Sequence, residues 1–203
     1  MSNPERVFIQ LALHSPCLLD MHEQRMLSPY EARHPLSGHP LMKGRFPAPV
    51  RGTVEIANEI GFKHFEVTVR VGGVWRRMPF PYQGDLLLYL LGANGVPYAV
   101  NWTIKDQGAA FGERRISSLK TPAQQRKDRE YAEGRAELEA AYYASAGIRT
   151  VKASLDSIAP TVQANLGLIF PMHGLSLSHP IELLSDFSAE VKEFIAKGEP
   201  AFL

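Results

Sequence analysis

The chain has 203 residues, 45% of them apolar, and its 22 Lys and Arg nearly balance its 21 Asp and Glu. This length suits one domain plus an appendage, and the near-zero net charge argues against a protein that coats nucleic acid non-specifically. One cysteine, Cys17, excludes an internal disulfide, and no stretch approaches the roughly 18 apolar residues of a membrane span, so we expect a protein of the reducing cytoplasm with no membrane partner.

Caps, turn signals and apolar spacing predict the elements of the first half of the chain. A short helix follows Asn3-Pro4, with Asn3 as the cap and proline in the first turn. A strand and a long loop rich in proline and glycine come next, before a short helix capped by Thr53 and a hairpin at Gly72-Gly73. The expected ranges are 4–14 for the helix, 17–27 for the strand, 28–52 for the loop, 53–61 for the second helix, and 64–71 and 74–80 for the hairpin strands.

The second half begins with a strongly apolar hairpin, "GDLLLYLLGANGVPYAVNWTIK", which turns at Asn94-Gly95. A long helix is expected over 121–147, with Pro122 in its first turn and Gly147 at its stop, and a closing strand over 148–154. Residues 155–203 are only weakly helical. We therefore predict one α/β domain over 1–154 and a short helical C-terminal extension over 155–203, a possible partner-contact region.

Two lone charges at the free ends of this hairpin indicate a functional site. A turn at Asn94-Gly95 brings Asp85 roughly opposite Lys105, and the alternation of strand side chains puts Thr103 on the same face. A carboxylate, a hydroxyl and an ammonium gathered there are able to share a metal ion and a phosphate, as in a nuclease. The alternatives are a surface ion pair of little consequence, and a register shifted by two residues that puts Asn101 in the place of Thr103.

Four stretches in order carry a wider pattern: "NPERVFIQLALHSPCLLDMHEQ", "TVEIANEIGFKH", "QGDLLLYL" with "AVNWTIK", and "AELEAAYYASAGIRTVKAS". The pattern resembles the TnsA-type endonucleases, which are small subunits of heteromeric cut-and-paste transposases in the restriction-endonuclease-like PD-(D/E)xK superfamily. This resemblance spans most of residues 2 to 154. It implies an α/β fold with a restriction-endonuclease-like mixed central sheet flanked by helices.

The resemblance also implies roles for individual residues. Glu5 matches the first acidic metal ligand, Asp85 the central one and Lys105 the active-site lysine. Thr103 stands where the superfamily usually has Glu or Gln, and it completes the implied metal set of Glu5, Asp85 and Thr103. Taken alone, Glu5 is an ordinary first-turn helix glutamate. The secondary candidates are Asn101, Glu139 and Gln24.

The implied activity is Mg²⁺-dependent hydrolysis of a phosphodiester in the 5′ strand of double-stranded DNA at transposon ends, with Mn²⁺ as a substitute ion. The implied partners are a DDE-type transposase subunit, which cuts and joins the 3′ ends, and an ATPase regulator. Two alternatives stay open. One is a non-catalytic scaffold or DNA-end-binding module, which the departure at Thr103 favours, and the other is a stand-alone restriction or repair nuclease.

Several other charged residues are weaker candidates. His34 and His39 lie in the proline-rich loop without zinc-site spacing, so loop polarity is the better interpretation. Glu137 and Glu139 are expected on a solvated face of the long helix, although Glu139 is able to approach the metal. The candidates for contact with the DNA backbone are Arg76, Arg77, Arg114, Arg115 and Lys120.

Overall fold

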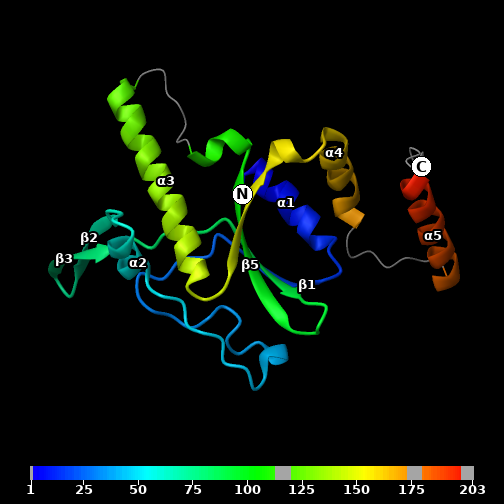
Figure 1. Cartoon of the computed structure of the whole chain (residues 1–203), viewed down its shortest axis with the longest axis horizontal. Coiled ribbons are helices and arrows are strands. Elements are labelled where there is room, and N and C mark those ends of the chain that lie inside the picture. Colours follow the sequence, from blue (N-terminus) through cyan, green and yellow to red (C-terminus); the bar gives the residue numbers. More distant parts are fainter. Residues whose placement is uncertain (1, 113–119, 173–179, 198–203) are drawn as a thin grey trace. The chain divides into compact units, whose positions relative to one another are not determined.

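The computed structural model describes residues 2–112, 120–172 and 180–197, which form a mixed α/β structure (Figure 1). The strands are β1 (Leu18–Glu23), β2 (Glu66–Val71), β3 (Val74–Pro79), β4 (Leu86–Leu91), β5 (Pro97–Lys105) and β6 (Arg149–Ser154). The helices are α1 (Asn3–Leu13), α2 (Thr53–Glu59), α3 (Pro122–Ala144), α4 (Pro160–Ile169) and α5 (Ile181–Lys197). The predicted α/β class is therefore confirmed.

The central sheet has four strands in the order β1-β4-β5-β6, and β2 and β3 form a separate two-stranded sheet. Strand β4 pairs antiparallel with both β1 and β5, whereas β6 pairs parallel with β5. A parallel neighbour requires a crossover connection, and α3 lies in the segment that links β5 to β6. The expected closing strand is therefore confirmed, and the crossover brings α3 back over the sheet.

Helices α1 and α3 cover opposite faces of this sheet (Figure 1). On one face Phe8 of α1 packs in a cluster with Leu86 and Leu88, and on the other Leu138 of α3 packs in a cluster with Leu87 and Tyr89. A strand that is buried on both faces needs consecutive apolar residues, which explains the run in β4. The β5 face that carries Asn101 and Thr103 is thus covered by α3.

Helix α1 begins one residue before its expected start. Its N-cap is Ser2, whose Oγ accepts a hydrogen bond from the Glu5 backbone at 3.4 Å, while Glu5 Oε2 accepts one from the Ser2 backbone at 2.7 Å. This reciprocal capping box satisfies two backbone donors at the helix start. The prediction of Asn3 as the cap is wrong, and so is that of Thr53, because Gly52 precedes α2 and the Thr53 hydroxyl contacts His64.

Both predicted hairpins are present, but one register differs from expectation. Gly72 and Gly73 have φ of 57° and 83° and join β2 to β3. In the β4–β5 hairpin, Leu86 pairs with Trp102, so the pairing continues to Asp85 beside Thr103. The expectation of Asp85 opposite Lys105 is wrong by two residues, because the turn closes around Asn94, where Gly92 N donates to Val96 O at 2.9 Å.

The chain divides into two compact units, residues 1–168 and 169–203. The first contains the central sheet, the β2–β3 hairpin and α1 to α3, while the second contains α5. Within the described ranges, no helix combines the length and the apolar character needed to cross a membrane.

Two helical glycines offer a matched test of how tightly α3 packs. A Cβ added at Gly134 would lie 2.6 Å from Cδ2 of Phe62, whose ring packs against Tyr131, whereas one added at Gly167 in α4 would meet nothing within 4 Å. Overpacking costs about 1–3 kcal/mol and alanine gains about 1 kcal/mol in helix propensity. We expect Gly134→Ala to lower the free energy of unfolding by about 1 kcal/mol and Gly167→Ala to raise it slightly, as measured by chemical denaturation. Stabilisation by Gly134→Ala would contradict this packing.

Candidate functional site

Asp85 lies just before β4 and is held against the end of β5. Its Oδ2 accepts a hydrogen bond from the Ile104 backbone N–H at 2.6 Å and lies 3.9 Å from Lys105 Nζ. Its own carbonyl accepts from the Gln24 backbone N–H at 2.9 Å. The side chains of Asp85 and Lys105 are 25% and 41% exposed, so this ion pair is partly shielded from solvent. The long lysine side chain closes the two-residue offset in the register.

Burial raises the pKa of Asp85 above its ordinary value. The Ile104 N–H and the Lys105 charge oppose this shift, while the negative charges of Glu139 and Glu5 add to it. Two other carboxylates therefore act on Asp85 at this end of the sheet. A cation bound there would offset both the cost of burying the Asp85 charge and the repulsion between the carboxylates.

Glu139 links α3 to the sheet. Its Oε1 accepts hydrogen bonds from Asn101 Nδ2 at 2.8 Å and from Thr103 Oγ1 at 3.0 Å, and its Oε2 accepts one from Arg135 Nη1 at 2.9 Å. The residue is only 4% exposed. The prediction of a solvated Glu139 is wrong, because α3 packs on the polar face of β5, but Glu137 is exposed as expected.

An oxygen-rich recess lies behind this network. Asn101 Oδ1 and Tyr143 Oη are buried and have no hydrogen-bond partner within the described residues. A Cβ added at Gly84 would lie 3.1 Å from Tyr143 Oη, 3.4 Å from Asn101 Oδ1 and 3.5 Å from Glu139 Oε1, so the glycine leaves these oxygens room. Burial also raises the pKa of Tyr143, which keeps its hydroxyl protonated.

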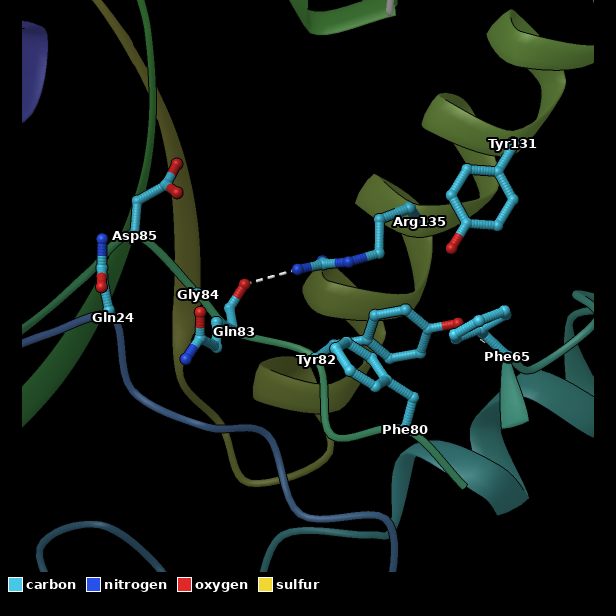
Figure 2. A pocket seen from close by; sticks show the side chains of 9 residues that line it. All are labelled: Gln24, Phe65, Phe80, Tyr82, Gln83, Gly84, Asp85, Tyr131 and Arg135. Carbon is cyan, nitrogen blue, oxygen red and sulfur yellow. Dashed lines mark hydrogen bonds between the residues drawn. The ribbon is translucent and has the colours of Figure 1, made fainter. Parts of the chain in front are cut away.

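Two hollows meet at Asp85. The smaller, of about 250 Å³, is lined on its polar side by Asp85, Thr103, Lys105 and Glu139. The larger, of about 610 Å³, runs along aromatic side chains that include Phe80 (Figure 2). Figure 2 shows Asp85 at one side of this space and the aromatic cluster at the other, with the Arg135 side chain extending between them. The residues that line both hollows are Gln83, Asp85, Tyr131 and Arg135.

The structure gathers most, but not all, of the residues singled out in the sequence. Asp85, Thr103 and Lys105 line one hollow with Glu139, and Gln24 lines the adjoining one. Asn101 is fully buried behind them. The Glu5 carboxylate caps α1 and acts on Asp85 through its charge.

The candidates for contact with the DNA backbone are more dispersed. Arg76 and Arg77 are exposed neighbours on β3 and so point to opposite faces of the hairpin. Lys120 is paired with Asp128. Arg114 and Arg115 lie outside the described residues.

The histidines of the proline-rich loop have local structural roles. His34 is buried and its Nδ1 accepts a hydrogen bond from the Leu36 backbone, so the expectation that loop polarity explains it is wrong. The Nδ1 atom of His39 accepts one from the Leu41 backbone.

The donor set of the smaller hollow fits a hard cation. Among the described residues, no group of three His, Cys, Asp or Glu side chains gathers in a set that could hold a metal ion. Magnesium, however, is usually bound by one or two carboxylates, several waters and substrate phosphates. Asp85 and Glu139 supply two carboxylates, Thr103 a hydroxyl, and the partnerless Asn101 Oδ1 lies next to them.

Several residues of this arrangement were missed in the sequence, among them Arg135, Tyr143 and Gly84. Arg135, Glu139 and Tyr143 repeat every four residues, so they lie along one face of α3. This spacing is a signal that the sequence contained. The need for a glycine at position 84 depends on the approach of α3 to the sheet, which local sequence does not reveal.

Two comparisons with known proteins found no relative. No protein-family model matches the chain, and a search of curated proteins found no match either.

The raised pKa of Asp85 predicts a gain in stability when its charge is removed. The folded state binds the proton of the Asp85 carboxyl more tightly than the unfolded chain does. Stability therefore falls as pH rises from the ordinary carboxyl pKa through the raised pKa of Asp85. We expect Asp85→Asn to unfold at a higher temperature than the wild type at neutral pH, and the difference to shrink as pH falls. Asp106→Asn, at an exposed neighbour, is the control. A lower unfolding temperature for Asp85→Asn at neutral pH would overturn this assignment.

The hydrogen bonds of Glu139 predict a large structural effect of its removal. Glu139→Ala removes the carboxylate that accepts hydrogen bonds from the half-buried Arg135 and the buried Asn101. We expect the free energy of unfolding to fall by about 3 kcal/mol. Glu137→Ala, two residues away on the exposed side of α3, should change it by less than about 0.5 kcal/mol. Equal effects in urea denaturation would show that the Glu139 network contributes little.

Proposed function

We propose that this chain is a metal-dependent DNA endonuclease with a restriction-endonuclease-like fold, and that it acts as the TnsA-type subunit of a heteromeric transposase. The observation that carries the proposal is the meeting of Asp85 and Lys105 at 3.9 Å, beside Thr103 and Glu139 in one hollow. The order helix, strand, antiparallel hairpin, helix and parallel strand supports the proposed fold.

Asp85 and Glu139 would hold Mg²⁺, or Mn²⁺ in its place, with the Thr103 hydroxyl beside them. When bound, the ion supplies an acidified water and charge stabilisation for phosphodiester hydrolysis. The resemblance points to Glu5 as a further ligand. Because the Glu5 carboxylate caps α1, we assign the ion first to the other two carboxylates.

Lys105 is the residue best suited to bind the scissile phosphate. Its ammonium lines the same hollow as both carboxylates and is held near Asp85, so it can donate hydrogen bonds to a phosphate oxygen and offset the charge that builds up there. Arg135 acts indirectly, because it holds the Glu139 carboxylate from the preceding turn of α3. Thr103 and Asn101 hold the same carboxylate from the sheet.

The proposed partners follow from charge and exposed surface. A net charge of +1 gives the chain little general attraction for DNA, which favours delivery to transposon ends by a DDE-type transposase. The second compact unit exposes apolar side chains on α5, namely Ile181, Leu183 and Phe187. They support the C-terminal extension as a contact region for the transposase or an ATPase regulator.

One observation favours a second candidate, a scaffold or DNA-end-binding module without chemistry. Thr103 replaces the usual Glu or Gln, and it donates its hydroxyl to Glu139, whose other oxygen is paired with Arg135. In this second interpretation the hydrogen-bond network is purely structural. The protein would then bind DNA ends without any dependence on metal ions.

The test is a cleavage assay on DNA carrying a transposon end, with Mg²⁺ or with EDTA, in the presence and absence of a DDE-type transposase that acts on that end. We expect metal-dependent cleavage of the 5′ strand only with the transposase, and a loss of at least about 100-fold in Asp85→Ala and in Lys105→Ala. Lys43→Ala, at an exposed loop position, should retain activity. Cleavage without the transposase would favour a stand-alone nuclease, and binding without cleavage in any metal would favour the scaffold.

A further inference from the structure

The larger hollow beside Asp85 is lined mostly by side chains that have no role in the proposed hydrolysis. Phosphate and metal require charge and oxygen donors, but four of the nine residues that line this hollow are aromatic (Figure 2). The lining rings are Phe65 just before β2, Phe80 and Tyr82 in the segment after β3, and Tyr131 on α3. Asp85 closes one side of the same space.

We propose that this hollow is a nucleobase pocket, which takes one unstacked base of the DNA strand whose phosphate lies at Asp85 and Lys105. The proposal rests on the proposed function for the position of that phosphate. It adds a substrate feature, namely that a base next to the cut leaves the helical stack.

The aromatic side chains have the exposure that stacking requires. Phe65 is 52% and Phe80 41% exposed, and their ring centroids lie 5.6 Å apart in an edge-to-face arrangement. Half-exposed phenylalanines on the wall of a hollow present free ring surface, on which an unpaired base can stack whatever its sequence. The volume of about 610 Å³ is within the range of roughly 300–1,000 Å³ that is typical of small-molecule sites.

The polar groups of the hollow suit the edge of a base better than a phosphate. The Arg135 guanidinium lies 4.8 Å from the centre of the Tyr82 ring, and its charge is already matched by Glu139. The remaining polar side chains include the amides of Gln24 and Gln83, which can both donate to and accept from a base edge. Gln24 also has a φ of 47°, an unfavourable backbone conformation for a non-glycine residue.

The neighbouring hollows give a path for the strand. Because Asp85 and Arg135 line both the aromatic hollow and the smaller one, a base in the first and a phosphate in the second belong to adjoining parts of one nucleotide chain. Tyr131 lines both and also borders a third hollow, of about 500 Å³, with Lys63 and Arg77. These two cations can bind the next phosphates, which gives Arg77 a role that Arg76, on the opposite face, does not share.

Fluorescence anisotropy in EDTA tests the pocket without any cleavage. The probe is a labelled single-stranded oligonucleotide, compared with a fully abasic strand of the same length. The double variant Phe65→Leu and Phe80→Leu keeps apolar volume but removes both rings, and we expect it to bind the normal strand about tenfold more weakly than the wild type does. Its affinity for the abasic strand should be unchanged. Phe46→Leu, at a ring that is 95% exposed in the loop, should bind like the wild type.

Three results would overturn the pocket: equal loss of affinity for both strands, no loss for either, or the same loss in Phe46→Leu. Thermal unfolding of each variant excludes misfolding as the cause, and the single variants repeat the test if the double variant is unstable. Failure here is distinguishable from failure of the proposed function. A protein that cleaves DNA but ignores the bases lacks the pocket, whereas one that binds bases but never cleaves lacks the activity.

Discussion

The buried carboxylate of Glu139 is the constraint on which the site depends. A charge that is nearly excluded from water must have partners, and here they come from β5 and from the preceding turn of α3. Together with the apolar cluster around Leu138, these hydrogen bonds fix how α3 lies across its face of the sheet. Both hollows at Asp85 take part of their walls from α3, through Tyr131 and Arg135, so their shape follows from the same contacts.

Asp85, unlike Glu139, has too few partners to offset the burial of its charge. Its burial and its carboxylate neighbours disfavour the charged form, and only the Ile104 N–H and Lys105 favour it. A carboxylate in this condition costs the fold stability while nothing is bound, and it gains most from a cation. The buried oxygens of Asn101 and Tyr143 lie nearby and have no hydrogen-bond partner among the described residues. This end of the sheet therefore has oxygen atoms that a bound ion or ligand could use.

The sequence was informative where the signal was local. Gly72-Gly73 and the Asn94 turn specify hairpins through backbone conformation, and Thr121 with Pro122 starts α3 one residue from its expected beginning. Long-range packing decided the rest. In the sequence Glu139 looks like a solvated charge, because only the packed structure shows that α3 covers β5. The position of Asp85 beside Thr103 rather than opposite Lys105 depends on a single residue in the turn. The sequence alone does not separate the two roles considered for Glu5, because a helix cap and a metal ligand can use the same residue type.

The measurement that tests the central claim most directly is a calorimetric titration of Mn²⁺ into the wild type, Asp85→Ala and Asp106→Ala. A site built on the Asp85 carboxylate predicts saturable binding in the wild type and in Asp106→Ala, and its loss in Asp85→Ala. The same binding in all three proteins would mean that Asp85 holds no metal. The chemistry proposed for this end of the sheet would then be wrong.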